Sequence, residues 1–349
     1  RTEGFEEFKK AVEEYTPEKC AEITGIPAED IIKAAEYFGT AETATLIYCM
    51  GITQHTTGVD NVKCLANLAM LTGNIGREAT GVNPLRGQNN VQGACDMGGL
   101  PNVYPGYQPV TTIDAQKKFG DAWAAKLSDQ MGRTIPEMLD GLSDGSVKAL
   151  YVMGENPVQS DPDTNHVKKA FGKAELLVVQ DIFLTPTAQM AHVVLPGACF
   201  AEKDGTFSNT ERRVTRVRKA IDPVGDARAD WEIIQELSTR FGYEMNYESP
   251  AAIMDEIATL TPSYGGIAYD RLEGEGLQWP CPDRDHPGTK FLHKDAFARG
   301  KGLFHAIGYK PPAEVVDEEY PFWLTTGRLF AHYHTATMTR NCPQLDAEI

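Results

Sequence analysis

The chain has 349 residues, of which 42% are hydrophobic and 23% charged, as is typical of a globular protein with two or three domains. Its formal net charge of −16 argues against nonspecific binding to nucleic acid or to an anionic membrane, because both need a basic surface. No apolar run approaches the roughly 18 residues of a membrane helix, so we expect no direct membrane insertion.

The chain contains seven cysteines, which are scattered and form no C-x-x-C pair. They predict neither a zinc ribbon nor an iron–sulfur cluster within these residues. An odd number of widely spaced cysteines fits a reducing compartment better than a disulfide framework, so we expect a cytoplasmic location. Because the chain begins with Arg1 rather than Met, we expect a piece of a longer polypeptide, in which any targeting segment lies upstream.

The first part of the chain predicts both helices and a strand. Residues 1–44 have a helical period, and Thr16 before a proline is typical of a helix start. Residues 45–50 predict a buried strand. Residues 59–71 place apolar side chains on one stripe and predict a helix that ends near Gly73. This part therefore has the pattern of an α/β fold.

Residues 74–110 have no sustained period and are dense in glycine, asparagine and proline. An irregular run of this length inside a compact chain is usually functional. It contains Arg86 beside glycine and several amides, and such a guanidinium could hold a small planar anion through two parallel hydrogen bonds. The alternative is a loop arginine that faces solvent.

A second α/β unit follows. Its predicted helices lie near residues 113–128, 134–142 and 163–171. Its predicted strands span residues 147–153, 176–180 and 192–195. Strands that alternate with helices favour a parallel sheet covered by helices, and ligands bind beyond the carboxyl ends of such strands. The loops 154–157 and 181–183 follow two of these strands, so we expect them to face a ligand.

These loops and a later helix carry three candidate side chains, each open to a structural interpretation. Asn156, in the sequence GENP, could contact a nucleotide or serve only a turn and a helix start. Asp181 could accept hydrogen bonds from a guanine or ribose edge, or cap the short segment TPTAQMA that follows it. Asp230 begins an apolar helical pattern over residues 230–241 and is typical of an N-terminal cap.

A cluster of cations lies in residues 198–222, which are predicted to be extended with turns. It comprises Arg212, Arg213, Arg216, Arg218 and Lys219. If the backbone is extended, Arg212, Arg216 and Arg218 share one face, which could meet a phosphate or an acidic partner. The alternative is the solvated face of a hairpin.

The chain is irregular from about residue 260 to residue 320, and residues 322–325 then predict a new strand. The segment 325–335 combines glycine, hydroxyls, an arginine and two histidines. His332 and His334 could be metal ligands, but no third candidate lies nearby in sequence. Polar contacts to an anionic cofactor suit this mixture better.

Together these motifs resemble the catalytic subunit of molybdenum- or tungsten-dependent formate dehydrogenases, within the bis-molybdopterin guanine dinucleotide oxidoreductases. The most specific stretch is NPLRGQNNVQGACDMGGLPNVYPGYQ, around Arg86. Four further motifs occur more broadly in that superfamily: MGENPVQSDPD, VVQDIFLTPTAQMAHVVLPG, AEKDGTFSNTERRV and TTGRLFAHYHTATMTRN. The resemblance implies an α/β fold with parallel-sheet domains of the formate dehydrogenase/DMSO reductase type and the beginning of a C-terminal β-barrel domain.

The family's architecture implies four parts of the chain. Residues 1–88 would end a first α/β domain with the active-site loop, and residues 89–200 would form a second, pterin-binding α/β domain. Residues 201–310 would contribute to the domain on the side of an iron–sulfur cluster. Residues 311–349 would start a truncated C-terminal β-barrel domain that also binds a pterin.

The resemblance implies a molybdenum or tungsten ion held by two molybdopterin guanine dinucleotides and by a cysteine or selenocysteine. The chain has no Cys-His dipeptide and no C-x-x-C pair. The cysteine or selenocysteine ligand, its neighbouring histidine and a [4Fe-4S] cluster are therefore expected upstream, and no residue of this chain is expected to bind the metal. Arg86 would be catalytic and orient formate, and Gln88 would contact a pterin. The positions implied around the guanine dinucleotides are Asn156, Gln180, Asp181, Lys203 and Asp230. The positions implied in a loop that wraps a pterin are Thr326, Gly327, Arg328, His332, His334 and Thr335.

The implied activity is the oxidation of formate to CO2, with two electrons passed to iron–sulfur subunits, ferredoxin or a hydrogenase. The piece by itself is expected to be inactive. One alternative is another molybdopterin oxidoreductase, such as a nitrate reductase. A second is a non-catalytic scaffold that resembles the large iron–sulfur subunit of respiratory complex I, although the motifs retained from Gly154 to Arg328 argue against it.

Overall fold

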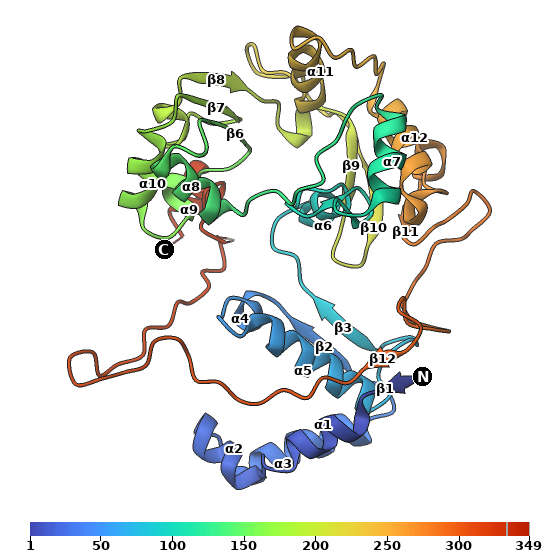
Figure 1. Ribbon diagram of the computed structural model, residues 1–349, viewed down its shortest axis with the longest axis vertical. Helices are drawn as coiled ribbons and strands as arrows, with labels where there is room; N and C mark the ends of the chain where they lie inside the picture. The colour runs from blue at the N-terminus through green and yellow to red at the C-terminus, as the bar shows by residue number, and fades with distance from the viewer. Residues whose placement is uncertain (333, 349) are drawn as a thin grey trace. The chain divides into compact units, whose positions relative to one another are not determined.

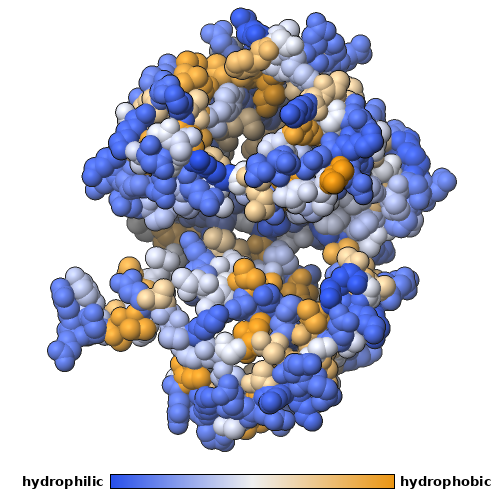
Figure 2. All heavy atoms as spheres, in the orientation of Figure 1, coloured by the Kyte–Doolittle hydropathy of each residue, from blue (hydrophilic) through white to orange (hydrophobic). Residues whose placement is uncertain are grey.

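The computed structural model describes residues 1–332 and 334–348, which form two compact units. The first unit contains Arg1–Arg86 and Thr289–Gly327, and the second contains Gly87–Gly288 and Arg328–Ile349. Figure 1 shows the elements of both units, coloured along the chain. Among the described residues, none of the helices combines the length and the apolar character needed to cross a membrane. On the face drawn in Figure 2, hydrophilic side chains predominate and hydrophobic ones are scattered.

The predicted helices of the first unit are confirmed. The structure has α1 (Phe5–Val12), α2 (Pro17–Thr24), α3 (Ala28–Thr40), α4 (Met50–Thr53) and α5 (Gly58–Leu71). Thr16 caps α2 as predicted, because its hydroxyl accepts a hydrogen bond of 3.3 Å from the Lys19 amide. Gly73 follows α5 with a φ of +70°, a left-handed conformation that glycine adopts without strain and that ends many helices.

The strands of the first unit pair over long distances in the sequence. They are β1 (Thr2–Glu3), β2 (Thr45–Tyr48), β3 (Gly81–Pro84) and β12 (Gly302–Leu303). In parallel pairs, β2 lies beside β3 and β1 beside β12. The prediction of a buried strand over residues 45–50 is wrong in two respects, because the strand ends at Tyr48 and its Ile47 side chain is 62% exposed. Its sheet has two strands in the described chain and therefore buries little of either one.

Residues 74–110, which were expected to be irregular, contain several short elements. Besides β3 they include α6 (Val91–Asp96), β4 (Val103–Tyr104) and β5 (Gln108–Pro109), which belong to the second unit. The sequence missed β3 because a strand of four residues, held by pairing with a distant partner, leaves no periodic pattern of its own.

One part of the second unit contains a parallel sheet with the strand order β6-β7-β8, which confirms the predicted parallel sheet. Its strands are β6 (Ala149–Met153), β7 (Leu176–Asp181) and β8 (Val193–Pro196). The helices that precede or connect them are α7 (Ile113–Ala122), α8 (Ile135–Asp144), α9 (Pro157–Ser160) and α10 (Thr164–Phe171). The buried core of this part includes Leu142, Val167, Phe171, Leu177 and Val179.

This core gives a first testable prediction. Leu177 is fully buried in β7, whereas the adjacent Leu176 is 42% exposed. We expect Leu177→Ala to lower the free energy of unfolding by about 2–5 kcal/mol, because it removes buried apolar surface and leaves a cavity. The matched control Leu176→Ala should lower it by less than about 1 kcal/mol. Urea unfolding of the two variants measures the difference, and equal losses would contradict this packing.

The rest of the second unit surrounds a small antiparallel sheet with the strand order β9-β10-β11. The strands are β9 (Gly205–Ser208), β10 (Arg213–Val217) and β11 (Leu277–Gln278). The remaining helices are α11 (Asp230–Arg240), α12 (Pro250–Leu260) and α13 (Pro343–Asp346). Short 3-10 turns lie at η1 (Ala188–Met190), η2 (Phe200–Glu202), η3 (Pro262–Tyr264), η4 (Tyr269–Arg271) and η5 (Thr339–Asn341). A second buried core joins the sheet to α12 and to the segment after it.

The strand predicted at residues 322–325 is wrong. These residues lie outside any strand, and the Leu324 side chain is 93% exposed. An apolar extended run becomes a strand only when another strand pairs with it, and no described strand pairs with these residues. The β-barrel that the resemblance implies after residue 311 thus remains a prediction.

Candidate functional site

A cavity of about 550 Å³ lies in the second unit, at the carboxyl ends of its parallel strands. Three loops supply much of its wall: residues 154–156 after β6, 180–183 at the end of β7 and 197–200 after β8. A parallel sheet places the carboxyl ends of its strands along one edge, so residues far apart in the sequence meet here. Both loops that were predicted to face a ligand line this cavity.

The remaining wall comes from the antiparallel sheet and the helices near it. Residues 203–207 contribute a lysine, an acid and Phe207, while α12 contributes Ile253, Met254 and Ile257. Tyr269 also lines the cavity, and the Arg216 guanidinium lies 4.0 Å from the centre of its ring. The cavity thus combines polar loops on the sheet edge with apolar and aromatic walls, as ligand pockets commonly do.

Gln180, Asp230 and Lys203 form a connected polar group in this wall. Gln180 is fully buried, and its Nε2 donates to Asp230 Oδ1 over 2.6 Å. Lys203 forms an ion pair with the other oxygen of Asp230. The Tyr151 hydroxyl donates to Gln180 Oε1, which fixes the orientation of the amide. The prediction that Asp230 is a helix cap is wrong, since Ala229 precedes α11 and the Asp230 side chain turns to Gln180 and Lys203 instead.

Asp181 lies at the end of β7 and has two roles. Its Oδ1 accepts a hydrogen bond of 2.9 Å from the Phe183 amide, so it caps the turn directly after β7, ahead of the segment TPTAQMA that the sequence suggested it would cap. The side chain also lines the cavity. Burial raises the pKa of the Asp181 carboxyl above its ordinary value. Burial likewise raises the pKa of Glu155 in the neighbouring loop, and the charges of Asp161 and Asp181 add to that rise.

Asn156 lines the cavity and also braces its wall. It is 4% exposed, and its Oδ1 accepts hydrogen bonds from the Thr187 amide at 3.2 Å and the Thr187 hydroxyl at 2.7 Å. Its Nδ2 donates to Gln159 over 3.0 Å. These bonds tie the loop after β6 to the segment after β7. Asn156 precedes α9, but its side chain binds Thr187 and Gln159 and makes no capping bond to that helix.

Arg86 and Gln88 fall on either side of the division between the units. Arg86 is the last residue of the first unit and is partly buried, whereas Gln88 is exposed in the second. Burial raises the pKa of the Tyr48 phenol, and the charge of Arg86 opposes that rise. The Arg86 guanidinium therefore interacts electrostatically with Tyr48, the last residue of β2.

The predicted pterin loop is partly exposed and partly buried. Thr326, Gly327 and Arg328 are exposed, at the end of the first unit and the start of the second. His332 is 6% exposed; its Nδ1 lies 2.8 Å from the Thr339 hydroxyl, and its buried Nε2 has no hydrogen-bond partner among the described residues.

His334 and Thr335 contact other loops of the second unit. The His334 ring lies directly against the backbone of Gly87, and burial lowers the pKa of this histidine. The Thr335 carbonyl accepts a hydrogen bond of 3.3 Å from Gln159, and the following Thr337 and Met338 line the cavity. No group of three or more histidine, cysteine, aspartate or glutamate side chains in the described chain is placed to hold a metal ion.

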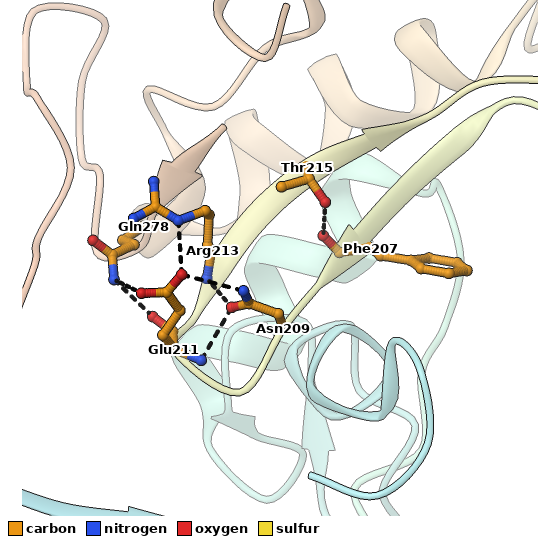
Figure 3. Close-up of polar contacts among 6 residues, drawn as sticks. All are labelled: Phe207, Asn209, Glu211, Arg213, Thr215 and Gln278. Carbon is orange, nitrogen blue, oxygen red and sulfur yellow. Dashed lines mark hydrogen bonds and ion pairs between the residues drawn. The ribbon is translucent and has the colours of Figure 1, made fainter. Parts of the chain in front are cut away.

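The cation cluster lies on the hairpin of β9 and β10, whose turn is held by its own side chains (Figure 3). Asn209 Oδ1 accepts hydrogen bonds from the amides of Glu211 at 3.0 Å and of Arg213 at 2.9 Å. Glu211 Oε1 lies 2.9 Å from Arg213 Nε. Gln278 on β11 donates to the carbonyl and the carboxylate of Glu211, both over 3.1 Å.

The other cations of the cluster also have partners within the chain, and Arg212 donates a hydrogen bond to the Trp279 carbonyl. Arg216 and Arg218 each lie 2.8 Å from a Glu273 oxygen, and Lys219 lies 2.7 Å from Asp222. Internal pairing of this kind favours the hairpin interpretation over a phosphate site.

Sequence reasoning missed two features of this cavity. Tyr151 points its hydroxyl at Gln180 from a neighbouring strand, and Tyr269 reaches the wall from a distant 3-10 turn. The alternation of side chains along β6 was the only local signal for Tyr151, and no local signal existed for Tyr269.

The sequence of the chain is similar to those of known proteins. The family model "Molybdopterin oxidoreductase" matches residues 7–240. The chain is 56% identical, over all of its length and 52% of the relative's, to the F420-dependent formate dehydrogenase subunit alpha of Methanocaldococcus jannaschii. It is 44% identical, over 99% of its length and 49% of the relative's, to formate dehydrogenase H of Escherichia coli. The chain thus spans about half the length of the curated relatives it matches.

A solved structure shares the fold. The acetylene hydratase from Pelobacter acetylenicus aligns with a TM-score of 0.58 at 22% identity, over 78% of this chain and 40% of that one. At this identity the likeness concerns the fold alone.

Proposed function

Because the chain belongs to the molybdopterin oxidoreductase family, we propose that it is part of a formate dehydrogenase catalytic subunit, which oxidises formate to CO2. The main observation behind the proposal is that the residues implied around the cofactor meet at one site. All five residues implied around the guanine dinucleotides line one cavity at the sheet edge, and Asn156 also braces its wall through Thr187. Similarity to formate dehydrogenase alpha subunits along the whole chain supports the choice of substrate.

The cavity suits the guanine end of a pterin dinucleotide. Guanine presents adjacent N–H donors that a carboxylate can accept in pairs, and Asp181 offers such a carboxylate at the cavity wall. Lys203 would neutralise phosphate charge, while Phe207 and Tyr269 supply aromatic surface for a planar base. A volume of about 550 Å³ is in the range of ligand pockets.

The chemistry is divided between the cofactor and the protein. When bound, the metal–pterin centre supplies the two-electron redox chemistry. Formate loses its C–H bond and leaves as CO2, while one proton and two electrons are released. The task of Arg86 is to bind the formate carboxylate through two parallel hydrogen bonds and to hold its charge in place as the C–H bond breaks.

Further residues would complete the cofactor site. Gln88 would contact one pterin, and the segment Thr326–Thr335 would wrap around a pterin. The metal is molybdenum or tungsten, and a [4Fe-4S] cluster would carry electrons to iron–sulfur subunits, ferredoxin or a hydrogenase in the cytoplasm. The division at residues 88, 200 and 310 into family domains is likewise proposed.

The proposed function is tested with the full-length polypeptide, purified without oxygen. We expect it to reduce a viologen dye with formate as the electron donor, and we expect reduced viologen not to be oxidised by nitrate. Both reactions are followed by the absorbance of the reduced dye. Nitrate turnover without formate turnover would identify the alternative, a nitrate reductase, and would contradict the proposal.

A further inference from the structure

A buried carboxylate lies away from the proposed catalytic and cofactor residues. Asp96, at the end of α6, is 1% exposed. Its Oδ1 accepts hydrogen bonds of 2.8 Å from both Gln92 Nε2 and the Tyr107 hydroxyl. Its Oδ2 accepts a hydrogen bond of 2.6 Å from the Tyr264 hydroxyl. An ionised carboxylate only accepts hydrogen bonds, so it matches three donors that no neutral side chain of this size could accept together.

These contacts join segments that are far apart in the sequence. Tyr107 belongs to the irregular run before α7, whereas Tyr264 belongs to η3 after α12. Burial raises the pKa of both phenols, and the negative charge of Asp96 adds to the rise. Both tyrosines therefore keep their protons and remain donors at every physiological pH. The backbone of Tyr107 has a φ of +59°, which is strained for a residue other than glycine. The hydrogen bond from its hydroxyl to Asp96 helps to hold this conformation.

The network continues to the wall of the cavity. The Tyr264 hydroxyl lies 3.0 Å from the Ser208 hydroxyl, at the end of β9. The Ser208 amide donates to Asn90 Oδ1 over 2.9 Å. Asn90 lines the cavity, as does Phe207, the residue before Ser208. The cavity lining does not include Asp96, Tyr264 or Ser208. These residues can therefore affect the wall only through the lining residues next to them, Asn90 and Phe207.

Glycine at position 93 shows how closely this wall is packed. A Cβ placed on Gly93 would overlap the Asn90 side-chain oxygen. Asn90 itself has a φ of +64° and precedes the first residue of α6. Its side chain is therefore confined between the α6 backbone and β9, and its position depends on the position of Ser208.

We propose that Asp96 is a positioning residue for the cavity: through Tyr264 and Ser208 it fixes the wall formed by residues 89–90 and 206–207 without touching the ligand. This inference rests on the proposed function, because it takes the ligand of the cavity to be the guanine nucleotide of the cofactor. Asparagine at position 96 would place an amide donor opposite donors, so at least one buried hydroxyl would lose its acceptor.

The test compares Asp96→Asn with Asp114→Asn in the full-length holoenzyme. Asp114 is an exposed carboxylate in the first turn of α7, in the same unit. We expect Asp96→Asn to speed amide hydrogen exchange about tenfold in residues 88–97 and 205–208, and to shorten the retention of guanine nucleotide about tenfold. Exchange in β6 and β7 and the formate turnover per bound metal should stay at wild-type values. Asp114→Asn should change none of these.

Two results would overturn the inference. One is an unchanged exchange rate in residues 88–97 or an unchanged nucleotide retention; the other is an equal rise in β6 and β7, which would indicate general destabilisation. If wild-type enzyme contains no guanine nucleotide, the proposed function fails, and the exchange pattern alone decides whether Asp96 holds the wall.

A milder variant keeps the test decisive if Asp96→Asn does not fold. Tyr264→Phe removes the hydroxyl that links Asp96 to Ser208 and leaves the carboxylate in place. Its control is Tyr104→Phe, since the Tyr104 hydroxyl makes an exposed contact of 3.4 Å with the Ser128 carbonyl in the same unit. We expect faster exchange at residues 205–208 and shorter nucleotide retention only in Tyr264→Phe, and equal behaviour of the two variants would overturn the inference.

Discussion

Full-length enzyme that carries Arg86→Ala is expected to lose formate oxidation by about 10²–10³-fold or more, while its cofactor content stays that of the wild type. The guanidinium would bind the formate carboxylate through two hydrogen bonds and hold its charge as the C–H bond breaks, and alanine supplies neither contact. The rate of formate-dependent viologen reduction per bound metal measures the effect. Turnover of Arg86→Ala at the wild-type rate would remove the main argument for a formate site here.

A second substitution separates geometry from charge. Arg86→Lys keeps the positive charge but loses the planar fork that matches a carboxylate, so we expect it to restore only a small part of the lost rate. The matched control is Arg299→Lys, since Arg299 is an exposed arginine of the same unit that contacts Glu3 at 2.7 Å. The control should retain wild-type turnover. If Arg86→Lys oxidised formate at the wild-type rate, the positive charge alone would suffice for the reaction and the planar geometry of the guanidinium would not be needed.

The second large effect is expected at the cavity. Asp181→Asn should speed the loss of guanine nucleotide from the holoenzyme by about tenfold to a hundredfold, because an amide replaces the carboxylate that would accept the guanine N–H donors. The nucleotide that remains after dialysis, measured by chromatography of the acid-released fraction, gives the rate. Glu175→Gln is the control, since Glu175 is 66% exposed next to the amino end of the same strand. Equal rates in the two variants would contradict the assignment of Asp181.

The same site has a pH dependence whose sign follows from burial. Burial raises the pKa of Asp181, so this carboxyl takes up its proton at a higher pH than an exposed aspartate does. Protonation replaces an acceptor by a donor, and nucleotide retention should therefore fall as the pH falls through that raised pKa. Asp181→Asn already lacks the charge and should lose this pH dependence.

The parallel sheet could be predicted from the sequence because its strands are short apolar runs separated by a helical pattern, which is a local signal. The position of Asp181 at a strand end followed from the same signal. The role of Asp230 did not, because a helix start and a buried hydrogen bond to Gln180 use the same residue type at the same place. Only the fold shows which partner is within reach.

Other features depend on contacts that no local pattern records. The apolar run around Leu324 has the composition of a strand but no strand to pair with, and it stays exposed. The hydrogen bonds of Asp96 connect α6 with Tyr264, 168 residues further along the chain. The cations of the β9–β10 hairpin were open to two interpretations from the sequence, and only carboxylate partners such as Glu273, which come from distant residues, favour the hairpin over an anion site.

The central claim is that this chain helps to hold a guanine-bearing pterin cofactor in a formate-oxidising subunit. Its most direct test is the content of metal and guanine nucleotide in the purified full-length polypeptide, by elemental analysis and by acid release of the nucleotide. The claim predicts molybdenum or tungsten together with guanine nucleotide. Absence of both would contradict it and would favour a scaffold subunit that has the fold without the cofactor.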